Sequence, residues 1–182
     1  SMPSDTPLTG KTVCLFVGPD FEDREVMIPY YRFLEAGATV EVAGLGEPTY
    51  KGKYGVPIQT TGAYTDFADR DFDALMIPGG WAPDKIRMDA AALAIVQKAM
   101  SRRVPVGCIC HGGWVLASAK VVQGKRLTSY LAIKDDLEHA GAVWSDAEVV
   151  VDDNLITSRK PDDLPAFMRA LLGRMAPLPA GV

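Results

Sequence analysis

Residues 104–119 constrain the fold of this chain more than any other stretch. An apolar run at 104–109 is typical of a buried parallel strand, and the small and apolar residues after it are typical of a helix. Cys110 and His111 stand at the join. A side chain on such a strand-to-helix turn lies at the carboxyl end of the strand, where open α/β sheets bind ligands. This stretch therefore predicts an α/β sheet with reactive groups at one edge.

Cys110 has the setting of a nucleophile. It precedes a predicted helix, whose positive end favours a thiolate over a thiol. Gly112 and Gly113 allow a tight turn and a close approach of substrate to the backbone. A buried structural cysteine remains an equally good interpretation of this pattern alone. Cys14 and Cys108 lie within apolar strands, and we expect them to be buried and inert.

Composition excludes several classes of protein. The net charge of -4 argues against a nucleic-acid partner, and no apolar run approaches the length of a membrane span. Three cysteines and two histidines are too few and too scattered for a structural zinc site, and we expect neither metal nor cofactor. An odd cysteine count without a visible secretory leader predicts a cytoplasmic protein.

Strands and helices alternate along the chain. Strands are expected at 11–17, 39–43, 73–77 and 104–109, and short ones at 143–144, 148–152 and 155–157. Helices are expected from the acidic residues 20–23 to Gly37, and at 90–102, 133–139 and 162–175, with a hairpin within 45–62. This order predicts a three-layer α/β/α sandwich, flavodoxin-like, with a mostly parallel sheet. One domain would cover residues 11–175, with flexible ends at 1–10 and 176–182.

Two candidate groups follow other strand ends, which should meet Cys110 at one edge of the sheet. Glu22 starts the first helix; it is either a charge that suits the helix dipole or a carboxyl group that shares a proton with the thiol. Spacing alone favours the helix charge. Gly79 and Gly80 form either a plain turn or an oxyanion site, with the backbone N–H of His111 as a further donor.

His111 should diverge from Cys110, because neighbouring side chains point apart. It could then turn outward to an acid, and Asp84 is available, although a helix N-cap is the better interpretation of Asp84. Trp81 and Trp114 flank two of the site segments. They are core packing or walls of a pocket.

The chain resembles the ThiJ/PfpI family, and its PfpI-like intracellular peptidase branch in particular. The resemblance runs from about Lys11 to Leu172, with matching segments at 21–23, 30–32, 73–80, 82–84, 109–112, 128–130, 133–136, 146–152, 158–159 and 161. It implies a flavodoxin-like sandwich that forms homodimers, in this branch often built into hexamers.

The resemblance also implies roles for individual residues. Cys110 would be the nucleophile, Glu22 the carboxylic acid hydrogen-bonded to it and His111 the adjacent base. The backbone N–H groups of Gly80 and His111 would form the oxyanion site, and the acid that a neighbouring subunit supplies matches Asp84. Further pocket positions would be Gly79, Gly112, Trp81 and Tyr130.

The function that follows is a cysteine-dependent hydrolase or a glyoxalase or deglycase of the stress response. Its substrate would be a small aldehyde or an acyl or peptide carbonyl, attacked by the thiolate. The alternative is a redox sensor or holdase chaperone in which Cys110 is oxidised to a sulfinic acid. A glutamine amidotransferase is excluded, because no histidine follows His139.

Overall fold

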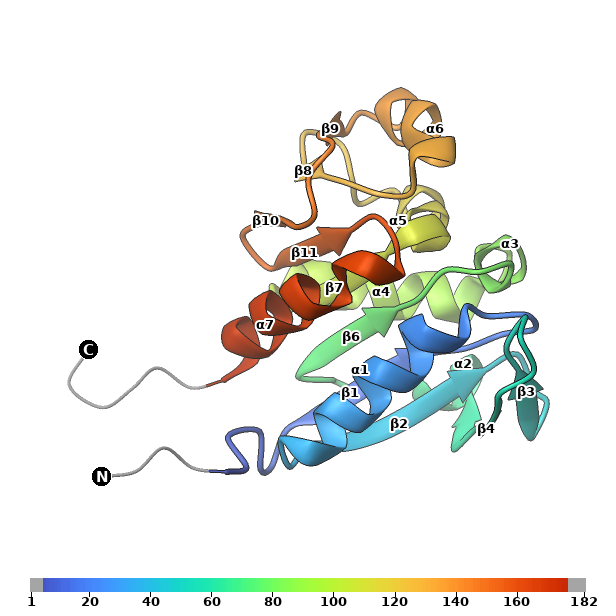
Figure 1. The fold of residues 1–182 in the computed structure, drawn as a ribbon. Helices are drawn as coiled ribbons and strands as arrows, with labels where there is room; N and C mark the ends of the chain where they lie inside the picture. The colour runs from blue at the N-terminus through green and yellow to red at the C-terminus, as the bar shows by residue number, and fades with distance from the viewer. Residues whose placement is uncertain (1–4, 177–182) are drawn as a thin grey trace.

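A seven-stranded sheet forms the centre of the protein in the computed structural model, which describes residues 5–176 (Figure 1). The strand order is β10-β11-β7-β6-β1-β2-β5, and every pair is parallel except β10 with β11. The strands of this sheet are β1 (Thr12–Phe16), β2 (Thr39–Gly44), β5 (Gly62–Ala63), β6 (Ala74–Ile77), β7 (Val106–Ile109), β10 (Val150–Asp152) and β11 (Leu155–Ser158). Two small two-stranded sheets pair β3 (Thr49–Lys51) with β4 (Pro57–Gln59) and β8 (Arg126–Leu127) with β9 (Val143–Trp144).

Helices cover both faces of the sheet. They are α1 (Asp23–Glu35), α2 (Tyr64–Phe67), α3 (Ala82–Ile86), α4 (Ala90–Arg102), α5 (Gly113–Ser118), α6 (Lys134–His139) and α7 (Leu164–Met175), with 3-10 turns η1 (Cys110–Gly112), η2 (Leu131–Ile133) and η3 (Pro161–Asp163). Helices α1 and α7 pack together in front of the sheet in Figure 1, and α4 packs with α2 and α5 behind it. This is the expected flavodoxin-like α/β sandwich.

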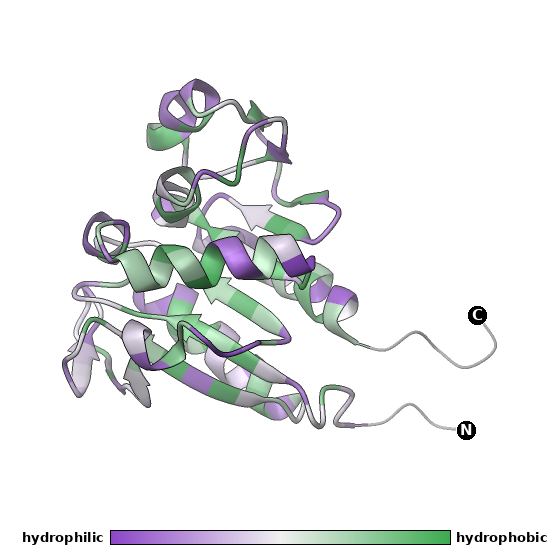
Figure 2. Cartoon of the chain, turned by 180° about the vertical axis from the view of Figure 1, so that it is seen from behind, coloured by the Kyte–Doolittle hydropathy of each residue, from purple (hydrophilic) through white to green (hydrophobic). Residues whose placement is uncertain are grey.

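Burial on both faces explains the continuous apolar strands. Every residue of β6, β7 and β11 is buried. Figure 2 shows the same apolar colouring along the central strands and polar colouring on exposed helix surfaces. A strand with one solvent-exposed face would instead alternate between apolar and polar residues. Among residues 5–176, no helix is long and apolar enough to cross a bilayer.

The expected elements recur with small shifts in their ends, and α4 has the predicted bounds. The short elements α2, β5 and β8 were not predicted, because two to four residues carry no readable periodicity. Residues 5–10 were expected to belong to a flexible end, but Leu8 is fully buried and its N–H donates to the carbonyl of Ala36 at 2.8 Å. The expectation for residues 1–4 and 177–182 lies outside the described residues.

The carboxyl ends of three neighbouring strands, β7, β6 and β1, meet at one edge of the sheet. A bridge between Phe21 and Gly80 joins the loops after β1 and β6, and a second bridge joins Phe21 to Gly52 of the β3–β4 hairpin. These bridges bring the loop after β1, the loop after β6 and the β3–β4 hairpin close to the turn after β7, so four segments that are distant in sequence meet at this edge.

Candidate active site

Cys110 lies at a strained turn. It is the first residue of η1, directly after β7, and its φ is 61°. A non-glycine residue in this left-handed region carries a conformational cost of about 1–3 kcal/mol, which the surrounding structure must offset. The turn leaves Cys110 only 7% exposed while placing it in the wall of a pocket.

His111 faces Cys110, contrary to the expectation that neighbouring side chains diverge. The Sγ atom of Cys110 lies 3.3 Å from Nδ1 of His111. The expectation was wrong because it assumed an extended or helical backbone, whereas the left-handed φ of Cys110 turns the two side chains to the same side. Burial and the charge of Lys53 lower the pKa of His111. A neutral imidazole at pH 7 can accept the thiol proton.

The imidazole of His111 is held among aromatic rings. It stacks on Tyr130 with a centroid distance of 5.0 Å and an interplanar angle of 23°, and it meets Trp114 edge-on at 5.3 Å. Trp81 lies 6.0 Å from the same ring. These contacts orient the histidine without using its nitrogen atoms.

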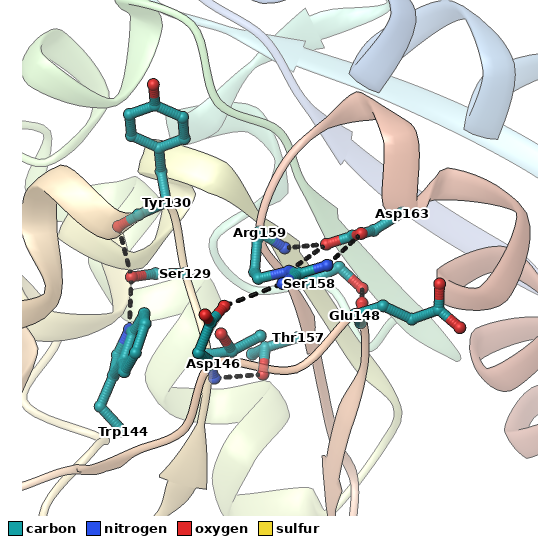
Figure 3. Close-up of polar contacts among 10 residues, drawn as sticks. Ser129, Tyr130, Trp144, Asp146, Glu148, Thr157, Ser158, Arg159 and Asp163 are labelled. Atoms are coloured by element: carbon teal, nitrogen blue, oxygen red, sulfur yellow. Dashed lines mark hydrogen bonds and ion pairs between the residues drawn. The ribbon is translucent and has the colours of Figure 1, made fainter.

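Tyr130 is itself fixed through its backbone. Its N–H donates to the carbonyl of Cys110 at 3.2 Å, and its carbonyl accepts from the Ser129 hydroxyl at 2.9 Å. The indole N–H of Trp144 donates to that hydroxyl at 2.9 Å, as Figure 3 shows. The ring stacked on His111 therefore belongs to a hydrogen-bonded segment.

Backbone N–H groups of Gly80 and His111 face the Cys110 sulfur and lower its pKa. Gly80 has a φ of 78°, and a Cβ atom there would lie 2.3 Å from the nitrogen of Glu22, so only glycine fits. These are the two donors expected for an oxyanion site. The N–H of Gly79 is directed elsewhere, to Oε1 of Glu25 at 2.8 Å.

Glu25, rather than Glu22, is the carboxyl group at the thiol. Its side chain is fully buried and hydrogen-bonds with Cys110. Its Oε2 atom receives no hydrogen bond from any residue in 5–176. Burial raises the pKa of Glu25 to about 8. A buried oxygen without a donor favours the protonated form, which can donate to sulfur.

Glu22 is a charge at the start of a helix, which is the interpretation that spacing alone favoured. Its carboxylate caps α1, accepting from the N–H groups of Arg24 and Glu25 at 2.9 and 3.1 Å. It also pairs with the guanidinium of Arg24 at 2.7 Å. The expected hydrogen bond between Glu22 and the thiol is therefore wrong. The carboxyl group at the thiol belongs to Glu25, about one helical turn later.

Helical spacing could have identified Glu25. Glu25, Pro29 and Phe33 recur at intervals of four residues and are all buried, so they share the inner face of α1. A glutamate on the apolar face of a helix needs a partner inside the protein. That signal is present in the sequence and was missed.

Opposing effects set the pKa of the Cys110 thiol. Burial and the charge of Glu25 raise its pKa, and the two backbone N–H groups lower it. Two anions cannot easily share this buried space, so Cys110 and Glu25 hold at least one proton between them. The helix dipole of α5 is thus not the dominant influence that the sequence suggested.

The pocket beside Cys110 has a volume of about 420 Å³. Its lining residues are Glu22, Arg24, Glu25, Lys53, Gly80, Trp81, Cys110, His111, Tyr130, Ala132 and Pro161. Lys53 and Arg24 are site residues that the sequence did not indicate. Gly112, expected in the site, packs beneath the turn instead: a Cβ atom there would lie 2.9 Å from the carbonyl oxygen of Ile77.

Asp84 is not brought to His111 within the chain. It is exposed in the first turn of α3, and its N–H donates to the carbonyl of Trp81 at 3.2 Å. The cap position belongs to Trp81, so the N-cap interpretation of Asp84 is also wrong. A role for Asp84 across a subunit interface stays a prediction.

The other two cysteines are buried, and burial raises the pKa of both thiols. Within the described part of the chain, no group of three histidine, cysteine or acidic residues could hold a metal ion.

Comparisons with known proteins agree on one family. The chain matches the DJ-1/PfpI family over residues 11–174. Deglycase PH1704 of Pyrococcus horikoshii is 43% identical over 157 residues, covering 86% of this chain and 95% of that protein. General stress protein 18 of Bacillus subtilis is 42% identical over 166 residues, covering 90% and 96%. The crystal structure of Drosophila melanogaster DJ-1beta is similar with a TM-score of 0.85 and 30% identity, covering 91% of this chain and 90% of that one.

Proposed function

The chain belongs to the DJ-1/PfpI family, and from that premise we propose that it is a cysteine-dependent deglycase or glyoxalase acting on small aldehydes of stress metabolism. The observation that carries the proposal is the cluster at the turn after β7. Cys110 lies 3.3 Å from His111, against a buried carboxyl group and two backbone N–H donors, in an open pocket.

The first step is attack of the Cys110 thiolate on an aldehyde carbon. The carbon–sulfur bond forms as the carbonyl π pair moves to oxygen, where the Gly80 and His111 N–H groups stabilise the developing charge. The carboxyl proton of Glu25 then passes to that oxygen. The product is a hemithioacetal, and Glu25 is left ionised.

His111 is the base for the second stage. It takes the proton from the hemithioacetal carbon of a 2-oxoaldehyde adduct, and a proton returns to the neighbouring carbon. The resulting thioester is hydrolysed by water to a 2-hydroxy acid, which restores the thiol. Every atom comes from the aldehyde and one water molecule, so this route consumes no cofactor.

Turnover of methylglyoxal tests the proposal. We expect the purified protein to form lactate, and Cys110→Ser to lose this activity by a factor of at least about 100, because the nucleophile is removed. Cys14→Ala, which alters a distant buried thiol, should retain it. Absence of turnover in the folded wild-type protein would reject the proposal. Peroxide conversion of Cys110 to a stable sulfinic acid would then favour the redox-sensor alternative.

Oligomer formation is part of the same proposal. PfpI-like relatives are expected to form homodimers, and hexamers built from them, and Trp81 beside the pocket is 58% exposed. An exposed aromatic side chain next to Asp84 is suited to contact a second copy of the chain.

A further inference from the structure

The tip of the β3–β4 hairpin reaches the active-site pocket. Gly52 pairs with Phe21, and the N–H of Lys53 donates to the carbonyl of Phe21 at 2.9 Å. Phe21 also pairs with Gly80 of the oxyanion site. The backbone at Lys53 is therefore tied to the segments that surround Cys110.

Asp23 fixes this tip from the other side. Its buried carboxylate accepts the N–H groups of Tyr54 and Val56, both at 2.9 Å. A Cβ atom at Gly52 would lie 2.3 Å from the same carboxylate, so hairpin and helix are in close contact. Charge-assisted hydrogen bonds of this kind are the stronger ones in proteins. The hairpin backbone is held in place, and Lys53 is presented at a defined position.

Lys53 is the pocket cation that is available to a ligand. The guanidinium of Arg24 is paired with Glu22. Lys53 makes no ion pair with any residue in 5–176; its Nζ lies 5.2 Å from the ring centroid of Tyr54. It lines the pocket together with Cys110, and its charge lowers the pKa values of Cys110, Glu25 and His111. The positive charge of the Lys53 ammonium group is therefore felt by the thiol, the carboxyl group and the imidazole of the site.

An anionic substrate meets a difficulty in this pocket. The reactive form of Cys110 is a thiolate, whose negative charge repels an anionic substrate. The ammonium group of Lys53, carried into the pocket lining by a hairpin whose backbone is held, offsets that repulsion and attracts a carboxylate.

We propose that Lys53 is the specificity-determining residue of this site and that it selects small carbonyl compounds carrying a carboxylate. The proposal rests on the proposed function for its substrate chemistry. Recognition of the anion itself depends only on the position of Lys53 beside Cys110.

Two alkylating reagents of nearly equal size measure this recognition without turnover. Iodoacetate is an anion and iodoacetamide is neutral, and with both the Cys110 thiolate displaces iodide. The ratio of their second-order rate constants is measured in the wild-type protein and in Lys53→Met, Lys53→Arg and Lys51→Met. Lys51 is exposed on the same hairpin and does not line the pocket, so Lys51→Met is the matched control.

We expect Lys53→Met to lower the iodoacetate-to-iodoacetamide ratio about fivefold to tenfold, the size of one unit charge acting across a partly solvated pocket. Lys53→Arg should keep most of the ratio, and Lys51→Met should leave it unchanged. The iodoacetamide rate reports whether each variant retains a reactive thiol, and Lys53→Gln replaces Lys53→Met if that variant does not fold. An unchanged ratio in a folded Lys53 variant, or an equal fall in Lys51→Met, overturns the proposal.

Measurements of enzymatic turnover distinguish a failure of this proposal from a failure of the proposed function. Lys53→Met should lower kcat/KM for 4,5-dioxopentanoate about fivefold to tenfold more than for methylglyoxal, since both are 2-oxoaldehydes and only the first carries a carboxylate. Equal losses for both substrates would contradict selection by charge. If the wild-type protein turns over neither aldehyde but the alkylation ratio falls as expected, the anion site stands and the proposed function fails.

Discussion

Three carboxyl groups within four residues of one another serve three different purposes in this protein. Glu22 caps α1 and pairs with Arg24, Asp23 holds the β3–β4 hairpin, and Glu25 lies against Cys110. All three side chains are buried, but their surroundings differ, and burial raises the pKa of Glu25 to about 8. The difference is hydrogen bonding, because Glu22 and Asp23 each accept at least two N–H bonds, whereas one oxygen of Glu25 accepts none.

Thiol reactivity distinguishes Glu25 from Glu22. A neutral carboxyl group that donates to a thiolate contributes about 1.5–3 kcal/mol, which corresponds to about one to two pKa units. We therefore expect Glu25→Ala to raise the thiol pKa of Cys110 and to slow its alkylation at pH 7 by about tenfold to a hundredfold. Glu25→Gln should retain part of the rate, because the amide can donate.

The control for this prediction is Glu22→Gln, which keeps an acceptor at the helix cap and lies one turn away from the sulfur. Its thiol titration, followed by the absorbance of the thiolate, should match the wild type. A shift in Glu22→Gln together with no shift in Glu25→Ala would restore Glu22 as the partner of the thiol.

The raised pKa of Glu25 predicts how stability depends on pH. The carboxyl group has a pKa of about 8 in the folded protein against 4.5 as the ordinary value, so the folded state binds more protons between these limits. The free energy of unfolding should therefore fall as pH rises from about 4.5 to 8. Urea denaturation at a series of pH values measures this slope.

Glu25→Gln provides the comparison for that slope, since an amide does not titrate. The fall in unfolding free energy between pH 4.5 and 8 should be smaller in this variant than in the wild type. Parallel curves for the two proteins would show that Glu25 does not carry the dependence.

At the scale of elements, the β3–β4 hairpin borders the candidate active-site pocket through Lys53. It lies outside the seven-stranded sheet, and β3 and β4 form a sheet of their own, so its place depends on contacts with Phe21 and Asp23. A two-stranded hairpin is marginally stable alone, and packing must hold it. The position of Lys53 is thus decided by a side chain of α1.

Asp23→Asn tests that dependence. An asparagine amide keeps one acceptor oxygen and opposes the second N–H with a donor group, so one of the two hydrogen bonds is lost. At about 1.5–3 kcal/mol for a bond to a charged group, hydrogen-exchange protection of the Tyr54 or Val56 amide should fall at least about tenfold. Amides in β6 and β7 should exchange at nearly the wild-type rate. Equal loss of protection throughout the protein would mean general destabilisation rather than release of the hairpin.

At the scale of the whole molecule, one edge of the sheet collects the reactive groups, and the side chains of Trp81 and Asp84 beside it are exposed. Asp84 lies in the first turn of α3 and does not line the pocket; its backbone N–H donates to the carbonyl of Trp81. If it acts on His111, it does so in a second copy of the protein. An aspartate is one methylene shorter than a glutamate, so we expect a weak or water-bridged contact.

Subunit mixing tests a shared site. Cys110→Ser and Asp84→Ala subunits should each form oligomers with low methylglyoxal turnover, the second reduced about tenfold through a poorly oriented imidazole. After mixing and exchange, some sites combine an intact cysteine with an intact aspartate, and part of the activity should return. Full activity in Asp84→Ala alone, or no recovery after verified exchange, would confine the active site to one chain.

The local pattern of the sequence was sufficient to predict the order of strands and helices and the fold class. Apolar runs and helical spacing predicted the central strands, the bounds of α4 and the alternation that leads to a flavodoxin-like sandwich. They also placed Cys110 on a strand-to-helix turn. These features depend on residues within about one element of each other, where periodicity and burial are directly linked.

Only the tertiary structure decided which groups surround the sulfur. Glu25 is selected over Glu22 by the rotation of α1 against the sheet edge, and Lys53 arrives on a hairpin whose position depends on contacts with residues about thirty positions earlier. His111 faces Cys110 because the backbone of Cys110 is left-handed, in a turn that packs so closely on β6 and its loop that a Cβ atom at Gly79 would lie 2.8 Å from the Cβ of Cys110. Such choices depend on distances between segments remote in sequence, which local periodicity does not encode.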